Sequence, residues 1–209
     1  QEELGTGTGN RLNIHHTIPR RVVADGDRVY ATLRFLGSPV SVLDAATGEV
    51  LTQALPGTTG ADELILSDGV LIVKATKKLS ANMGTRVSRD KLDDTLAAVD
   101  VKTGKLLWRK AGVRVLPYAL SALDGHVVYH NMDALVCLDA RTGREKWRTP
   151  NRIASTSGGK SNLVLHDGVA LYFGDGEAPA SAKKPPAPTD RKSRKKSGGA
   201  QFLTSVSLD

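Results

Sequence analysis

Short segments in which apolar and polar residues alternate run along most of the chain, and turn-forming pairs separate them. One marker is an Asp-Gly pair followed by an apolar run. It occurs four times, with its Asp at Asp25, Asp68, Asp124 and Asp167. Alternation with a period of two is typical of strands, and Asp-Gly is a favoured two-residue hairpin turn. The pattern predicts strands near residues 18–24, 28–35, 39–44, 49–54, 61–67, 70–75, 95–100, 105–110, 117–123, 126–131, 133–138, 144–149, 161–166, 169–174 and 201–208.

A second marker, A-x-D-x-x-T-G-x-x-x-W, recurs between these segments. It is complete at 98–108; the copy at 137–147 begins with Cys137, the copy at 42–52 ends on Thr52, and a fourth copy starts at Ser207-Leu208-Asp209. Asp can bond its own backbone two residues on, and Gly accepts a positive φ, so D-x-x-T-G closes a short hairpin. Turn geometry therefore accounts for the motif aspartates Asp44, Asp100, Asp139 and Asp209.

The spacing of the two markers predicts the architecture. From each motif Asp to the next Asp-Gly pair the chain runs 24, 24 and 28 residues, whereas from each pair to the following motif Asp it runs 19, 32, 15 and 42 residues. Repeated four-stranded units of about 40 residues are typical of a β-propeller. We predict an all-β chain in which residues 1–209 form one partial propeller domain of about three and a half antiparallel four-stranded blades, a fragment of a larger closed propeller.

On these motif copies the sequence resembles the pyrroloquinoline-quinone-like repeat (quinoprotein-like) β-propellers, whose blade signature is the same string. The resemblance implies that Trp108 and Trp147 lie flat between neighbouring blades. Thr52 cannot do this, which leaves the packing after the first blade open. The resemblance alone also suggests an extracytoplasmic or periplasmic location.

The net charge of +7 comes from two insertions. Residues 76–94 hold five basic and three acidic side chains, and residues 177–200 hold seven and two, so the rest of the chain is neutral. Both segments join the second and third strands of a unit, which places the excess charge on one face. The composition of 177–200, rich in Lys, Pro, Ser and Gly, predicts disorder. It is interpreted as a solubilising loop or as a contact for an acidic partner or another protein domain; nucleic acid is disfavoured as a partner.

Other candidate sites are weak. Ala154 to Ser161 fits a relaxed phosphate-loop pattern, but strands and not the required helix are predicted after it. Gly5, Gly7 and Gly9 resemble part of a dinucleotide-binding motif, but they lack the preceding strand that such a motif requires. His126 and His130, four apart on a strand, would lie about 13 Å apart, too far to share one zinc ion. Cys137, the single cysteine, is expected to be a buried, inert thiol. No run of 18 apolar residues indicates a membrane span.

We therefore predict no catalytic and no metal-binding residue, name no cofactor-binding residue, and expect no cofactor in this segment. The function favoured is a non-catalytic propeller scaffold or binding module within a larger protein, and the sequence disfavours an enzymatic role. The alternative is a segment of a pyrroloquinoline-quinone-dependent dehydrogenase. The resemblance implies that such an enzyme holds its quinone over a Trp with a calcium ion bound by Glu and Asn or Asp, and those ligands would lie outside this chain.

Overall fold

The computed structural model describes residues 20–34, 37–76, 86–87, 93–153, 156–157, 161–175 and 201–208. These residues form antiparallel sheets, and no helix occurs among them. The first blade contains β1 (Val22–Asp25), β2 (Arg28–Thr32), β3 (Val40–Asp44) and β4 (Val50–Thr52). The second contains β5 (Ala61–Ser67), β6 (Val70–Thr76), β8 (Asp94–Asp100) and β9 (Leu106–Val113).

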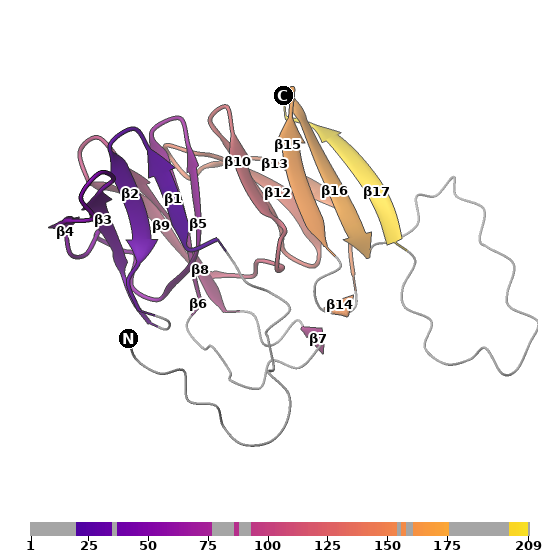
Figure 1. Cartoon of the computed structure of the whole chain (residues 1–209). Coiled ribbons are helices and arrows are strands. Elements are labelled where there is room, and N and C mark those ends of the chain that lie inside the picture. The colour runs from indigo at the N-terminus through magenta and orange to yellow at the C-terminus, as the bar shows by residue number, and fades with distance from the viewer. Residues whose placement is uncertain are drawn as a thin grey trace, which may run out of the picture.

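The third blade contains β10 (Leu120–Leu123), β11 (His126–His130), β12 (Ala134–Asp139) and β13 (Glu145–Pro150). In the fourth, the described residues form three strands, β15 (Asn162–His166), β16 (Val169–Asp175) and β17 (Gln201–Ser207). Strands pair in chain order within each blade, and Figure 1 shows the blades side by side, also in chain order. The predicted all-β propeller architecture and its strands are confirmed, and the described blades do not close into a ring.

One small sheet was not expected from the sequence. Strand β7 (Arg86–Val87), inside the 76–94 insertion, pairs with β14 (Thr156–Ser157), in the connection between the third and fourth blades. Both lie below the blades in Figure 1. The two segments therefore meet on one face of the blades, and the connection between the third and fourth blades contributes a short strand at 156–157. The 177–200 insertion and Gly5 to Gly9 lie outside the described residues.

The Asp-Gly pairs form tight hairpin turns. Asp68 and Gly69 have φ values of 52° and 71°, and the pairs at Asp124 and Asp167 repeat this geometry. Two consecutive positive φ values are the mark of a type I′ turn, which suits the right-handed twist of paired strands. In the first blade the predicted Asp25-Gly26 turn is wrong, because Asp25 is the last residue of β1 and pairs with Arg28. The turn there consists of Gly26 and Asp27, with a positive φ at Gly26.

The D-x-x-T-G segments close the hairpin between the third and fourth strands as predicted. In the third blade, Asp139 Oδ1 accepts hydrogen bonds from the Thr142 backbone N–H and hydroxyl, both at 2.7 Å, and Gly143 takes a φ of 69°. Asp44 and Asp100 make the same contacts in the first two blades. Hydrogen bonds to the ionised form lower the pKa of all three carboxyl groups. The motif aspartates are therefore turn residues.

The fourth motif copy is shifted by two residues from the sequence prediction. In the third blade the N–H of Ala140, the residue after the motif Asp, donates to the Gly125 carbonyl of the first hairpin turn at 2.8 Å. In the fourth blade the Leu208 N–H makes this bond to the Gly168 carbonyl. Ser207 therefore occupies the motif Asp position that the sequence pattern assigned to Asp209, a residue outside the described part of the chain. A serine hydroxyl can serve the same type of turn.

The hydrophobic core lies between blades and not within a single sheet. One cluster joins the first and second blades, for example Val42 with Leu71, and another joins the second and third, for example Ile72 with Val136. A third joins Val128 and Leu135 of the third blade to Leu163 and related side chains of the fourth. Every sheet is therefore held by the blade next to it, as in other repeat architectures.

Candidate functional site

The two tryptophans join neighbouring blades through one repeated contact. Trp108, on β9, donates its indole N–H to the Ala140 carbonyl in the next blade at 2.8 Å. Its ring covers Gly143, where an added Cβ would lie 2.6 Å from Trp108 Cδ2. Trp147, on β13, likewise donates to the Leu208 carbonyl at 3.2 Å. The expected position of both rings between blades is confirmed, although each ring remains partly exposed.

Leu55 takes this role in the first blade, where Thr52 stands at the Trp position. Leu55 is 5% exposed, and its Cδ2 atom lies 3.8 Å from the position of a Cβ on Gly104, the motif glycine of the second blade. An apolar side chain three residues after the Trp position thus covers the next turn, without the indole hydrogen bond. The sequence pattern alone did not single out Leu55.

A buried cluster of charged side chains lies at one end of the second blade. Lys74 Nζ, at the end of β6, is 3.0 Å from Asp62 Oδ2 and 3.8 Å from Asp94 Oδ1. Asp62 and Glu63 come from the start of β5, and Asp94 from the start of β8. Asp62 lies at a register shift between Ala61 and Glu63, and such bulges re-aim side chains. Three strands therefore bring these side chains together.

The hydroxyl of Thr76 bridges the two aspartates. Its Oγ1 atom lies 2.7 Å from Asp62 Oδ2 and 2.8 Å from Asp94 Oδ1, and it accepts a hydrogen bond from Lys74 Nζ at 3.2 Å. A hydroxyl has one hydrogen to donate, so both short contacts are hydrogen bonds only when one carboxyl group carries a proton. Asp62 lies nearer the ammonium group, at 3.0 Å against 3.8 Å for Asp94.

Burial and the neighbouring charges shift the pKa values of these groups. Burial raises the pKa of Asp94 and of Glu63 above their ordinary values, and Lys74 offsets this only in part. Burial alone would lower the pKa of Lys74, but Asp94, Asp62 and Glu63 outweigh it and raise that pKa. Lys74 is therefore a protonated amine without a nucleophilic lone pair. The sequence signal for the cluster is a lysine inside the apolar strand V-L-I-V-K-A-T, which the motif analysis passed over.

The cluster also connects the first three blades. Asp94 Oδ2 accepts a hydrogen bond from the Val115 N–H at 2.9 Å, in the connection to the third blade. The Arg20 guanidinium lies 3.9 Å from Glu63 and donates to the Leu120 carbonyl on β10 at 3.5 Å. The Arg20 carbonyl accepts a hydrogen bond from the Leu64 N–H at 2.7 Å. The polar groups at this end of the molecule are therefore engaged in joining blades.

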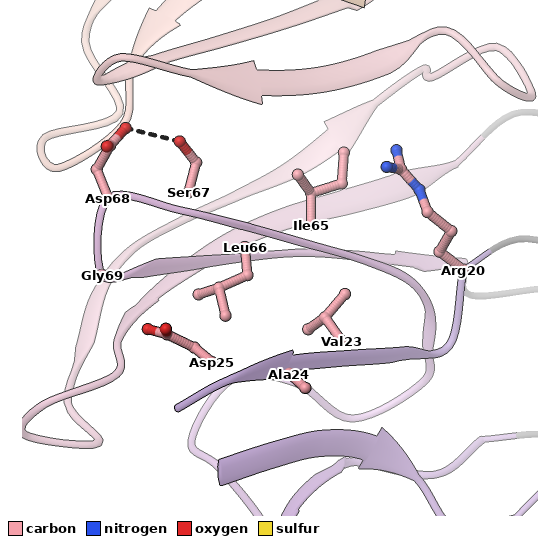
Figure 2. A pocket seen from close by; sticks show the side chains of 9 residues that line it. All are labelled: Arg20, Val23, Ala24, Asp25, Ile65, Leu66, Ser67, Asp68 and Gly69. Carbon is pink, nitrogen blue, oxygen red and sulfur yellow. Dashed lines mark hydrogen bonds between the residues drawn. The ribbon is translucent and has the colours of Figure 1, made fainter. Parts of the chain in front are cut away.

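A groove of about 430 Å³ runs between β1 and β5. In Figure 2 the Arg20 side chain lies at one end, Asp25 and Asp68 at the other, and apolar side chains such as Val23 between them. Ser67 donates a hydrogen bond to Asp68 at 2.6 Å, and that carboxylate also accepts from the Gly125 N–H of the third blade. These contacts lower the pKa of Asp68. This groove is thus bounded by residues that tie blades together.

His130 is buried between the third and fourth blades. Its Nδ1 atom accepts a hydrogen bond from the Met132 N–H at 2.9 Å, and its ring stacks on Tyr172 with centroids 4.5 Å apart. Burial lowers the pKa of His130 to about 4, although the Asn151 carbonyl and Asp133 favour the charged form. His126 instead contacts Lys146. No set of three or more His, Cys, Asp or Glu side chains in the described ranges could hold a metal ion.

We expect His130 to make the protein less stable in mild acid. The unfolded chain takes up a proton below about pH 6.5, whereas the folded chain resists protonation until about pH 4. Unfolding free energy should therefore fall as the pH drops, by about 2 kcal/mol between pH 7 and pH 5 and about 3 kcal/mol by pH 4. Urea unfolding across this range measures the effect.

The control is the H130F variant, which keeps an aromatic ring against Tyr172. Glu63 and Asp94 have raised pKa values and act in the opposite direction, but they are present in both proteins, so the difference between the two pH profiles isolates His130. Parallel profiles for the two proteins would contradict the prediction.

Two further sequence candidates have structural roles. Cys137 is fully buried, and burial raises the pKa of its thiol to about 11, so the expected inert thiol is confirmed. Ser161, at the end of the phosphate-loop-like segment, donates its hydroxyl to the Pro117 carbonyl at 2.7 Å. Strand β15 follows Ser161 in place of the helix that a phosphate loop requires.

The four-stranded blades, the repeated turns and the tryptophan contacts define a β-propeller of the pyrroloquinoline-quinone-like repeat class. A family model described as outer membrane protein assembly factor BamB matches residues 6–152 and 92–177, and the chain belongs to this family. Among curated proteins, none matches the chain in sequence. The part of the chain that the structure describes contains no helix with the length and apolar character that crossing a membrane needs.

Solved structures that are similar to this chain are distant in sequence. The computationally designed protein Ika4 is 16% identical, with 78% of this chain and 89% of that chain covered and a TM-score of 0.51. A quinohemoprotein alcohol dehydrogenase from Pseudomonas putida is 15% identical over 74% of this chain, at a TM-score of 0.49. BamB from Moraxella catarrhalis is 18% identical over 80% of this chain, at a TM-score of 0.43. This chain spans 28% of the dehydrogenase and 51% of BamB.

Proposed function

We propose that this chain is a segment of a non-catalytic propeller that serves as a scaffold for binding other proteins. The observation that supports it is where the motif side chains are engaged. The indole N–H groups of Trp108 and Trp147 are bonded to the next blade, and the carboxylates of Asp100 and Asp139 are bonded to their own turns. Groups used in this way build a rigid surface and do not converge on a substrate.

The family supports the binding role and the location. Its model carries the name of an outer membrane protein assembly factor, a protein whose name describes work with other proteins at a membrane. On that basis we propose that this segment acts outside the cytoplasm, in contact with other protein domains. An acidic partner for the basic 177–200 insertion belongs to the same proposal.

Titration with pyrroloquinoline quinone and calcium tests the non-catalytic role. We expect neither stoichiometric binding by calorimetry nor dye-linked oxidation of alcohols or sugars, because the carboxylates of the buried cluster are occupied by Lys74 and Thr76. Metal ions and quinones need side-chain ligands that are available to them. Stoichiometric quinone binding with alcohol oxidation would instead support the dehydrogenase alternative.

Matched variants would locate any binding that is found. The D62N and D94N variants change the only buried aspartates among the described residues. Asp27 is exposed, so D27N serves as the control. Loss of binding in the first two variants but not in D27N would place a cofactor site at the second blade.

A further inference from the structure

The last residue of β1 carries a carboxylate at a position where the other described blades have no acidic side chain. Asp25 pairs with Arg28 across the first turn. Its equivalents, which pair across the same turn in the later blades, are Ser67, Leu123 and His166. Leu123 packs against the core between the third and fourth blades, so this position faces the next blade. The Asp25 side chain therefore faces the second blade, at one end of the groove between β1 and β5.

Asp25 has no cationic partner among the described residues. Its side chain is exposed and makes no hydrogen bond or ion pair with any of them. Arg28, directly opposite on β2, lies within 4.0 Å of the Asp27 and Asp44 carboxylates instead. Asp68 adds a second carboxyl group at the same end of the groove, and its hydrogen bonds lower its pKa. This end of the groove is therefore suited to a cation that a ligand supplies.

The middle of the groove is apolar. Val23 on β1 and Leu66 on β5 line it, and both are half-buried and pack against the core that joins the first and second blades. Figure 2 shows Val23 between Asp25 and Arg20. The exposed parts of these two side chains offer apolar surface, and a ligand that removes this surface from water gains free energy.

The opposite end of the groove is basic. Arg20 is the one basic residue among the described residues that line it. Its side-chain contacts with described residues both use Nη2 and are long, 3.9 Å to Glu63 and 3.5 Å to the Leu120 carbonyl. The Arg20 side chain is 59% exposed. Its Nε and Nη1 donors are therefore available to a carboxylate of a ligand.

The backbone of β1 offers an unpaired edge beside the groove. Among the described strands, β1 pairs with β2 alone. The Arg21 carbonyl accepts a hydrogen bond from the Thr32 N–H, and bonded pairs alternate along the ladder, so Val23 and Asp25 are bonded to β2 as well. The N–H and carbonyl of Ala24 therefore point to the free edge, and Ala24 is an exposed residue of the groove. An extended chain can add to such an edge.

We propose that the groove between β1 and β5 binds an extended segment of a partner protein, antiparallel to β1, with a basic, an apolar and an acidic side chain at alternate positions. The basic side chain meets Asp25 and Asp68, the apolar one lies between Val23 and Leu66, and the acidic one reaches Arg20. The inference rests on the proposed scaffold role and names the chemistry of its partner.

The dimensions and the direction of the segment follow from strand geometry. Alternate residues of a strand share one face, and three such positions span about 13 Å, against about 16 Å from Arg20 to Asp25 along β1. Long basic and acidic side chains cover the difference. The antiparallel direction is chosen because antiparallel pairs are the commoner and slightly more stable kind. It places the basic residue nearer the amino end of the segment.

A heptapeptide of this pattern provides the probe, acetyl-Thr-Arg-Thr-Val-Thr-Glu-Thr-amide, in which threonine favours the extended form. The full chain, labelled for NMR, is titrated with it. We expect saturable shifts at the amides of 22–25 and 64–69, with a Kd of about 1 mM or lower. The Ala24 amide should also exchange more slowly with solvent. The peptide with Arg and Glu exchanged has the same composition and charge and should bind at least threefold more weakly.

Two variants of the full chain form a matched pair. Asp25 and Asp167 are both exposed, and Asp167 lies in the turn of the fourth blade, where asparagine tolerates its positive φ. D25N and D167N each remove one carboxylate. D25N should weaken peptide binding at least threefold, and D167N should leave it unchanged. A peptide with Gln in place of Arg should bind D25N and the parent equally, which would assign the effect to the pair of Arg with Asp25.

Several results would overturn the proposal. They are the absence of saturable shifts, shifts centred outside 22–25 and 64–69, and equal binding of the charge-exchanged peptide or of D25N. An Ala24 amide already protected before peptide is added would assign the edge to another part of the chain, and protection lost on dilution would assign it to a second copy. Quinone binding is measured separately, so failure here leaves the non-catalytic role intact, and stoichiometric quinone binding would overturn that role without affecting this result.

Discussion

Replacing Lys74 with methionine is expected to lower the free energy of unfolding by about 3–5 kcal/mol, the usual cost of leaving buried charges without their partner. Lys74 neutralises Asp62 and lies near Asp94 and Glu63, and all three acidic residues are 5% exposed or less. Without the ammonium group, Asp62 becomes an uncompensated buried charge. Urea unfolding at neutral pH measures the loss.

Two further variants establish the cause. Lys102 is exposed in the motif turn, so K102M should change the unfolding free energy by no more than about 0.5 kcal/mol. The double variant K74M/D62N removes both charges of the closest pair and should recover part of the loss, which would show as coupling in a double-mutant cycle. A K74M protein within about 1 kcal/mol of the parent would show that the cluster is hydrated and not a buried ionic core.

Replacing Trp108 with alanine is expected to cost about 3 kcal/mol, the lower end of the range for large aromatic side chains, because the ring is only partly buried. The variant loses the ring's contact with Gly143 and leaves the Ala140 carbonyl without its indole donor. Denaturant unfolding measures this loss, and a single transition shifted to lower denaturant is expected.

Conservative replacement separates the two contributions. The W108F variant keeps most of the apolar contact and loses the hydrogen bond, which should cost about 1 kcal/mol. W147A tests the same contact at the next interface, where the indole bond to Leu208 is longer, and should cost no more than W108A. If W108A unfolds at the midpoint of the parent, the ring does not stabilise the interface.

Much of the fold could be predicted because its signals are local. The hairpin at Asp68 and Gly69 depends on the φ preferences of two adjacent residues, and the contacts of Asp139 reach only three residues along the chain. The motif prediction was less accurate where the local pattern was ambiguous. The two residues of the first hairpin turn are Gly26 and Asp27, and Ser207 occupies the Asp position of the fourth motif copy. Strand register and not residue identity sets these positions.

The candidate site could be predicted only in part. The side chains of Trp108 and Trp147 were expected between blades, but the sequence did not show which carbonyls they meet. The buried cluster was missed because its members come from three strands, as with Lys74 and Asp62, which are 12 residues apart, and nothing in a single strand marks them as neighbours. The predictions of no catalytic and no metal-binding residue stay predictions.

By itself the sequence determined the strands, the turns, the repeat and hence the propeller class, because periodicity and turn chemistry act over a few residues. Tertiary structure alone decided which side chain covers which turn. Leu55 reaches Gly104, Arg20 reaches Leu120 across 100 residues, and Gly48 remains uncovered by the described residues. Packing between blades depends on shape and distance across the whole chain, and it is this packing that separates the filled interfaces from the turn at Gly48 that the described residues leave uncovered.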